Sequence, residues 1–160
     1  MKVQVIIAAA ALVLVAGGCG LSTTDWKRLE PASPAEDFTL PQLDGPPVTL
    51  SELRGQVVLM EFWATWCGPC RYSTPSLDQI YRRYRDRGVS VLLVNEGERP
   101  EAVRAWLNRR FVAPILLDAD QSVGQRYGVS GIPMLFVVDR EGQIVYVQSG
   151  LGGTATYGVS

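Results

Sequence analysis

An apolar run followed at once by two closely spaced cysteines constrains this chain more than any other feature. Residues 57–63 are apolar except for Glu61, as expected of a central β-strand that is covered on both faces. The segment 66–70 (Trp-Cys-Gly-Pro-Cys) comes next, and an amphipathic segment near Pro75 then predicts a helix. Because only two residues separate the cysteines, one helical turn brings their sulfur atoms within disulfide distance. The sequence therefore predicts a pair of thiols at a strand-to-helix junction.

The position of Cys67 favours a thiolate, which is the attacking species in disulfide exchange. Pro69 suits the first turn of a helix because it has no N–H to lose there. Cys67 then lies at the helix N-terminus, where unpaired backbone N–H groups and the positive end of the helix dipole stabilise a negative charge. These residues indicate thiol-disulfide chemistry.

Other uses of such a cysteine pair are a structural disulfide, half of a zinc site and a haem anchor. The chain contains no histidine, which excludes His-ligated zinc, axial-His haem and the Ser-His-Asp and Cys-His catalytic groups. A haem anchor needs histidine directly after the second cysteine, where this chain has Arg71. A zinc site needs two further Cys or His ligands, and only Cys19 remains. We therefore expect redox exchange without a metal or another cofactor, with a structural disulfide as the alternative.

Segments on both sides of the cysteines resemble the thioredoxin superfamily. Residues 62–65 (Phe-Trp-Ala-Thr) lead into the motif as in that family, and residues 131–133 (Gly-Ile-Pro) resemble its cis-proline loop. The lead-in segments 37–40 and 48–50, together with a signal-like N-terminus, are similar to the exported TlpA/ResA group of thiol-disulfide oxidoreductases. The resemblance covers roughly residues 34–150.

The resemblance implies a role for each residue of the site. Cys67 would attack a substrate disulfide, and Cys70 would then resolve the mixed disulfide. Glu61 falls at the position of the buried acid of thioredoxins, so its pKa should be raised by burial and it could accept the Cys70 proton. A buried carboxylate satisfied by a nearby polar group is the alternative for Glu61. The residues expected to contact the substrate are Trp66, Gly68, Pro69, Ile132 and Pro133.

Two positions depart from the family pattern. Ser73 stands where many members of the exported group carry a second acid, which would leave proton handling to Glu61. Met134 replaces the threonine that is common after the proline, and either faces the core or contacts the substrate.

The residues between the cysteines bear on the direction of electron transfer. Gly68-Pro69 resembles the reducing thioredoxins rather than the oxidising exported members. A reductant outside the cytosol must be recharged because that compartment is oxidising. The resemblance therefore implies a membrane electron donor of the thiol-reductase type and disulfide-bearing protein substrates, for example in cytochrome c maturation. The alternatives are a disulfide-donating oxidase, a non-catalytic binding module, and a copper-binding or copper-delivery protein that uses the thiols of Cys67 and Cys70, with Met134 as a further candidate ligand.

The N-terminus predicts export to the membrane. Residues 5–16 are almost wholly apolar after one early lysine, but the run is shorter than the roughly 20 residues of a membrane-spanning helix. The small residues before Cys19 resemble a bacterial lipoprotein processing site, which would make Cys19 the lipidated first residue of the mature chain. We expect a bacterial protein that faces the periplasm or the cell exterior, with an ordinary secreted or tethered form as the alternative. The net charge of −1 gives no indication of nucleic acid.

The length of 160 residues allows one domain with a sizeable core. Strand patterns alternate with helical ones and end in a hairpin, which predicts an α/β thioredoxin-like mixed sheet with flanking helices. A further hairpin, about Asp44-Gly45, precedes the core fold. The C-terminal helix of the family is missing from the pattern. The predicted divisions are a signal peptide (1–18), a tether (19–33), the domain (34–150) and an irregular tail (151–160).

Overall fold

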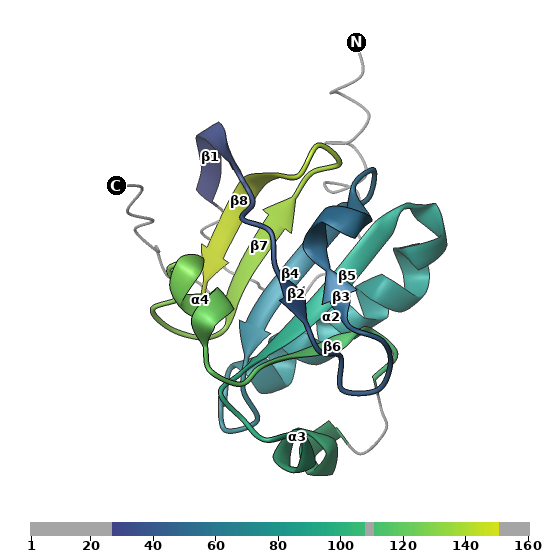
Figure 1. The fold of residues 1–160 in the computed structure, drawn as a ribbon, viewed down its shortest axis with the longest axis vertical. Helices are drawn as coiled ribbons and strands as arrows, with labels where there is room; N and C mark the ends of the chain where they lie inside the picture. Colours follow the sequence, from purple (N-terminus) through teal and green to yellow (C-terminus); the bar gives the residue numbers. More distant parts are fainter. Residues whose placement is uncertain (1–26, 108–110, 151–160) are drawn as a thin grey trace, which may run out of the picture.

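A mixed sheet of six strands organises the part of the chain that the structure describes (Figure 1). The computed structural model describes residues 27–107 and 111–150. The predicted signal peptide, Cys19 and the tail 151–160 lie outside these residues. The elements in chain order are β1 (Lys27–Pro34), β2 (Thr39–Leu40), β3 (Val48–Thr49), the 3-10 helix η1 (Leu50–Leu53), β4 (Val57–Trp63), α2 (Cys70–Tyr84), the 3-10 helix η2 (Arg85–Arg87), β5 (Val89–Glu96), α3 (Pro100–Leu107), β6 (Ile115–Asp118), α4 (Ser122–Arg126), β7 (Met134–Val138) and β8 (Gln143–Ser149).

Strand β4, which the apolar run 57–63 predicted, lies in the interior of the sheet. The order across the sheet is β1-β8-β7-β4-β5-β6, so β4 has a neighbour on each side. It pairs parallel with β5 and antiparallel with β7, and β5 pairs parallel with β6. The predicted mixed sheet with flanking helices is therefore confirmed. The predicted N-terminal hairpin is confirmed as well, since β2 and β3 form a separate antiparallel pair.

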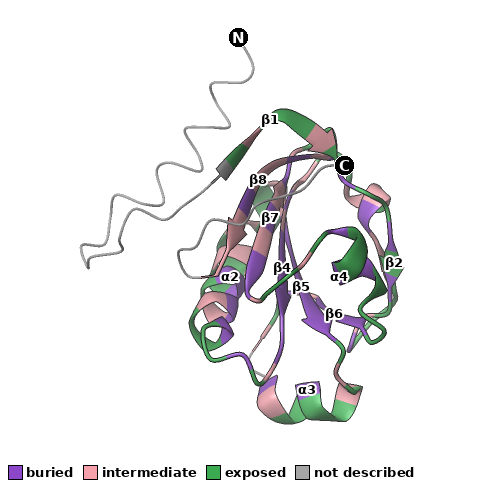
Figure 2. Ribbon diagram, turned by 90° about the vertical axis from the view of Figure 1, so that its left-hand side faces the viewer, coloured by how far each residue is buried: buried purple, intermediate pink, exposed green. Residues whose placement is uncertain are grey.

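Strand β4 supplies alternate side chains to two cores on opposite faces of the sheet. Met60 and Phe62 belong to the core that also holds Tyr127, next to α4. Trp63 belongs to the other core, to which α2 and α3 contribute. Figure 2 shows α2 and α4 on opposite sides of the buried strands. Because successive side chains of a strand point to opposite faces, Glu61 shares the α2 face with Trp63.

The prediction that residues 19–33 form a tether is wrong for residues 27–33, which belong to a strand. Strand β1 pairs antiparallel with β8 at the edge of the sheet, with a register shift between Arg28 and Ser33. Leu29 packs against the core on the α4 side. An edge strand tolerates proline and an irregular register because only one of its sides must pair. Residues 27–34 contain Pro31 and lack alternation of apolar and polar residues, so the sequence did not indicate a strand here. The sheet therefore begins before residue 34.

An aromatic cluster fills the core on the α4 side. The ring of Tyr127 lies 6.0 Å from that of Phe38, 5.8 Å from that of Phe62 and 5.3 Å from that of Phe136, measured between centroids. Tyr127 is buried, and its hydroxyl donates a hydrogen bond of 2.5 Å to the backbone carbonyl of Glu36. One side chain thus joins the segment before β2 to the sheet.

We predict that Tyr127→Ala lowers the free energy of unfolding by about 4 kcal/mol, because it leaves a cavity among three aromatic rings. Tyr127→Phe keeps the ring and should cost only about 1 kcal/mol, the value of one buried hydrogen bond. Urea denaturation measures both, with the exposed Tyr72→Phe as a neutral control. Equal losses for the two Tyr127 variants would contradict this description of the core.

Candidate active site

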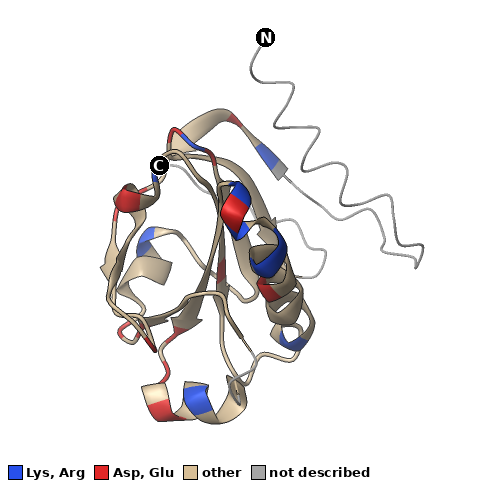
Figure 3. Cartoon of the chain, turned by 90° about the vertical axis from the view of Figure 1, so that its right-hand side faces the viewer, with Lys and Arg blue, Asp and Glu red and all other residues tan. Residues whose placement is uncertain are grey.

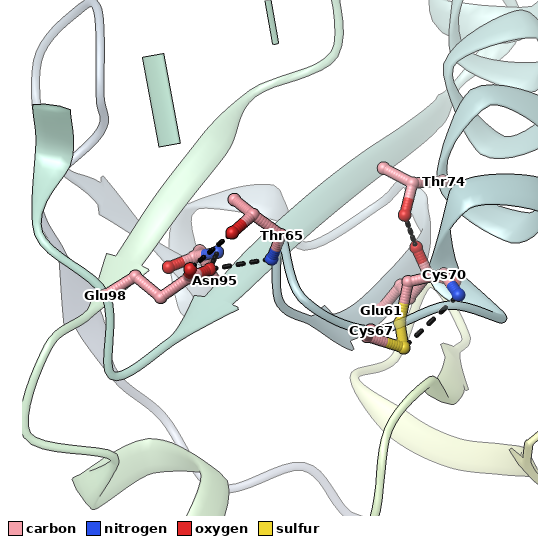
Figure 4. Close-up of a disulfide and its surroundings, with 7 residues drawn as sticks. All are labelled: Glu61, Thr65, Cys67, Cys70, Thr74, Asn95 and Glu98. Atoms are coloured by element: carbon pink, nitrogen blue, oxygen red, sulfur yellow. Dashed lines mark hydrogen bonds between the residues drawn. A yellow bond between two sulfur atoms is a disulfide. The ribbon is translucent and has the colours of Figure 1, made fainter. Parts of the chain in front are cut away.

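The two cysteines of the motif form a disulfide where β4 passes into α2 (Figure 4). Their Cα atoms are 5.3 Å apart, as the spacing in the sequence predicts. Helix α2 begins at Cys70, directly after Pro69. The backbone N–H of Cys70 points at the sulfur of Cys67, with a distance of 3.2 Å between the nitrogen and sulfur atoms. The sulfur of Cys67 therefore lies where the first N–H groups of the helix stabilise a thiolate.

The two cysteines differ in their access to solvent. Cys67 is 4% exposed, whereas Cys70 is completely buried. Trp66, Gly68 and Pro69 are exposed around them, and the exposed fraction of Trp66 reaches 70%. A macromolecule that approaches the disulfide therefore meets the exposed residues of the motif, and Cys67 is the more exposed of the two cysteines.

Glu61 is buried beneath the first turn of α2. Its side chain is only 1% exposed, and one carboxyl oxygen accepts a hydrogen bond of 2.9 Å from the hydroxyl of Thr74. Thr74 lies one helical turn beyond Cys70, which brings the carboxyl under the motif, as Figure 4 shows. Burial raises the pKa of Glu61 from its usual value of 4.5 to about 7. The hydroxyls of Ser73 and Thr74 lower the pKa, but by less than burial raises it. This carboxyl can therefore hold or release a proton near neutral pH.

The Ser73 hydroxyl lies on the same side of α2 as Glu61. It is buried and close enough to Glu61 to lower the pKa of that carboxyl, although the two groups do not form a well-aligned hydrogen bond. The hydroxyl of Ser73 is neutral, so Glu61 is the carboxyl beneath the motif that can exchange a proton.

A second polar cluster holds the segment just before the motif, and sequence reasoning missed it. The carboxyl of Glu98 accepts hydrogen bonds from the backbone N–H of Thr65 at 2.7 Å and from its hydroxyl at 2.5 Å. The buried side chain of Asn95 donates to the same carboxyl at 2.7 Å (Figure 4). Three donors on one carboxyl fix the turn that carries Trp66 and Cys67.

The arrangement follows from the pairing of the parallel strands. Trp63 at the end of β4 lies opposite Asn95 near the end of β5. Polar residues at the carboxyl ends of adjacent parallel strands meet at one edge of the sheet. Asn95 and Glu98 follow the apolar residues 91–94, and this pattern in the sequence could have predicted the cluster.

The predicted cis-proline loop lies at the same end of the sheet. The peptide bond between Ile132 and Pro133 is cis. Ile132 is half-buried and packs against the core cluster that contains both cysteines of the motif. Met134, in contrast, is buried in the core on the α4 side, so the core-facing interpretation of this residue is the correct one.

A metal site is not evident in the described ranges 27–107 and 111–150, where no three or more Cys, Asp or Glu side chains gather closely enough to hold an ion. The copper alternative uses the two thiols, with Met134 as a further candidate ligand. Met134 is buried in the core on the α4 side, which leaves only Cys67 and Cys70 for that alternative.

Comparisons with known proteins agree with this geometry. The model of the Redoxin family matches residues 30–155. The thiol-disulfide oxidoreductase ResA of Bacillus subtilis (strain 168) is 35% identical over 125 residues, which are 78% of this chain and 70% of the relative. The ResA protein of Geobacillus kaustophilus is also 35% identical, over 119 residues, or 74% of this chain and 68% of the relative.

Solved structures give the same result. A putative thiol:disulfide interchange protein DsbE from Chlorobium tepidum superposes with a TM-score of 0.69 at 34% identity, covering 74% of this chain and 84% of that one. A putative protein disulfide isomerase from Bacteroides thetaiotaomicron has a TM-score of 0.69 at 32% identity, covering 76% and 79% of the two chains. These matches confirm the thioredoxin-like fold and the thiol-disulfide oxidoreductase activity. The chain belongs to the Redoxin family and is a ResA/TlpA-like member of the thioredoxin superfamily.

Proposed function

We propose that this protein reduces disulfides of other proteins with the dithiol form of Cys67 and Cys70. The observation that carries the proposal is a disulfide at the N-terminus of α2 with a protonatable carboxyl buried beneath it. A structural disulfide would need neither the N–H of the helix terminus directed at the Cys67 sulfur nor the raised pKa of Glu61.

The reaction begins with the thiolate of Cys67. It attacks one sulfur of the substrate disulfide, the substrate S–S bond breaks, and the second substrate sulfur leaves as a thiolate that takes up a proton. The product is a mixed disulfide between Cys67 and the substrate. One contact and one difference in exposure support Cys67 as the nucleophile: its sulfur accepts a hydrogen bond from the N–H of Cys70, and Cys67 is the more exposed of the two cysteines.

Resolution requires the buried thiol of Cys70 to lose its proton. The carboxylate of Glu61 accepts this proton, and the Cys70 sulfur then attacks the sulfur of Cys67. The mixed disulfide breaks, the substrate leaves with its second thiol, and the Cys67–Cys70 disulfide forms. Two electrons have moved to the substrate, so a thiol-type electron donor must reduce the pair again. A pKa of about 7 suits Glu61 to this exchange because the group changes its protonation state near neutral pH.

The substrate segment lies on the exposed residues of the motif and on the cis-proline loop. Trp66, Gly68 and Pro69 supply an exposed surface around Cys67. The backbone at Ile132, ahead of the cis bond to Pro133, pairs with the substrate chain in the manner of a β-strand.

The site of action lies outside the cytosol, at the membrane. The signal-like residues 1–18 and the cysteine at position 19 support export and lipid attachment at Cys19, which would leave the domain on a short segment ahead of β1. The described helices include none that is long and apolar enough to cross a bilayer. A membrane thiol reductase supplies electrons, and cytochrome c awaiting haem attachment is the example of a substrate that the resemblance to the exported group provides.

We predict that Cys70→Ser accumulates a mixed disulfide with a protein substrate such as insulin, because attack by Cys67 proceeds but resolution does not. Cys67→Ser should form no such adduct. Non-reducing electrophoresis and mass spectrometry of the full chain identify the adduct, and Cys19→Ser serves as the control for the third cysteine. Trapping by Cys67→Ser rather than Cys70→Ser would reverse the roles of the two cysteines.

We predict that Glu61→Gln slows resolution of the mixed disulfide by about a hundredfold, since a general base contributes roughly 10²- to 10⁴-fold. In the unsubstituted chain the rate should rise with pH through about 7, as the carboxyl loses its proton. That inflection should vanish in Glu61→Gln and persist in Glu52→Gln, which changes an exposed carboxyl. Stopped-flow fluorescence measures the rate, and an unchanged pH profile in Glu61→Gln would dispose of the base role.

The same substitution has a second readout in stability. The folded chain keeps the Glu61 proton up to about pH 7, whereas the unfolded chain releases it near 4.5. The free energy of unfolding should therefore fall as the pH rises between these two values, and Glu61→Gln should lack this decline.

A further inference from the structure

A groove of about 570 Å³ runs along one side of α2 and is not part of the site described above. Its lining comes from two parts of the chain. Helix α2 contributes Arg71, Pro75, Asp78, Gln79 and Arg82, and the segment at and after α3 contributes Trp106 and Phe111. We call this feature the α2 groove.

The α2 groove begins next to the redox pair in the sequence, since Arg71 directly follows Cys70. The other α2 residues of its lining follow Arg71 by four, seven, eight and eleven positions, which places them on one face of the helix. From Arg71 to Arg82 the helix rises roughly 16 Å, enough for about five residues of extended chain. A protein whose disulfide is held at Cys67 therefore has neighbouring residues within reach of the groove.

Aromatic rings form a firm wall of the groove. Trp106 and Phe111 stack with 5.8 Å between their ring centroids and an interplanar angle of 22°. The buried Trp63 supports them from within the core, 5.0 Å from Trp106. Both wall residues remain partly exposed, so this wall offers a flat apolar surface to an incoming side chain.

The charge of the groove is positive because its acid is already engaged. The carboxyl of Asp78 accepts hydrogen bonds from the backbone N–H groups of Val112 at 2.6 Å and Ala113 at 2.7 Å, and it pairs with Arg82 at 2.7 Å. Arg71 is exposed and forms no ion pair with any residue in the described ranges. Its guanidinium therefore remains open to an anion from outside.

The surrounding helix strengthens this charge. Figure 3 shows Lys and Arg concentrated along α2 and η2. The residues from 70 to 87 include five arginines (Arg71, Arg82, Arg83, Arg85, Arg87) and two aspartates (Asp78, Asp86). The whole chain has a net charge of −1, so the excess of positive charge here is local.

We propose that the α2 groove binds an acidic segment of the protein substrate, adjacent in sequence to the disulfide that Cys67 attacks. A carboxylate of that segment pairs with Arg71, and an apolar neighbour packs on Trp106 and Phe111. This assignment rests on the proposed function, because it presumes that the substrate is a protein disulfide. Binding in the groove would give the enzyme a preference among substrates that the motif and the cis-proline loop alone would bind with equal affinity.

The test uses two peptides with the same disulfide core, one flanked by Glu and Asp and the other by Gln and Asn. We expect the reduced full chain to prefer the acidic peptide by about fivefold in kcat/KM at low salt, mainly through KM. Arg71→Gln should bring the ratio of the two peptides close to one, and Arg71→Lys should restore part of it because the charge returns. The matched control is Arg83→Gln, which removes an exposed charge from the same helix outside the groove.

Two results would overturn the assignment. The first is equal use of both peptides by the unsubstituted chain; if the chain then also sediments with phosphatidylglycerol vesicles, the arginines are assigned to a lipid surface. The second is an equal loss of preference in Arg83→Gln and Arg71→Gln, which would indicate the general field of the helix rather than the groove. Failure of the proposed function is distinct, since neither peptide nor a small neutral disulfide would then be reduced.

Discussion

The burial of one carboxyl, that of Glu61, is the constraint on which the rest of the site depends. A charged carboxylate inside the sheet is unfavourable, and Glu61 is next to only the hydroxyls of Thr74 and Ser73, with no ion pair among the described residues. The group therefore keeps its proton until the pH approaches 7. Helix α2 covers it and places Cys70 directly above, so the same burial that is costly for stability provides a proton acceptor for the resolving thiol.

The sheet arranges the remaining parts around this carboxyl. Parallel pairing of β4 with β5 brings the turn before Cys67 next to Glu98, whose three hydrogen bonds fix that turn. Antiparallel pairing of β4 with β7 brings the segment of Pro133 to the same end of the sheet. The start of α2 then leaves Trp66 exposed, Cys67 slightly exposed and Cys70 completely buried. The α2 groove extends this surface along the helix, with Arg71 as the residue that joins the redox pair to the groove.

Local sequence patterns were sufficient where neighbouring residues decide the structure. The apolar run of β4, the Cys-Gly-Pro-Cys spacing and the hairpin of β2 and β3 depend on local periodicity and turn chemistry, and all three appear as predicted. Strand β1 was missed because an edge strand is specified by its partner β8, more than a hundred residues away in the chain, and its own pattern is broken by prolines. Asn95 and Glu98 were missed for a similar reason, since their partner Thr65 is adjacent only through the pairing of two strands. The export signal, lipidation of Cys19 and the irregular tail lie outside the described residues and remain predictions.

The reduction potential of the Cys67–Cys70 pair tests most directly whether this protein acts as a reductant. The full chain is equilibrated with graded ratios of reduced and oxidised thiol, and the fluorescence of its tryptophans, two of which lie at or next to the motif, reports the fraction reduced. A value close to that of thioredoxin, about −270 mV, is the result we predict. A value close to that of the strong oxidant DsbA, about −120 mV, would contradict the reducing assignment and make the protein a disulfide donor.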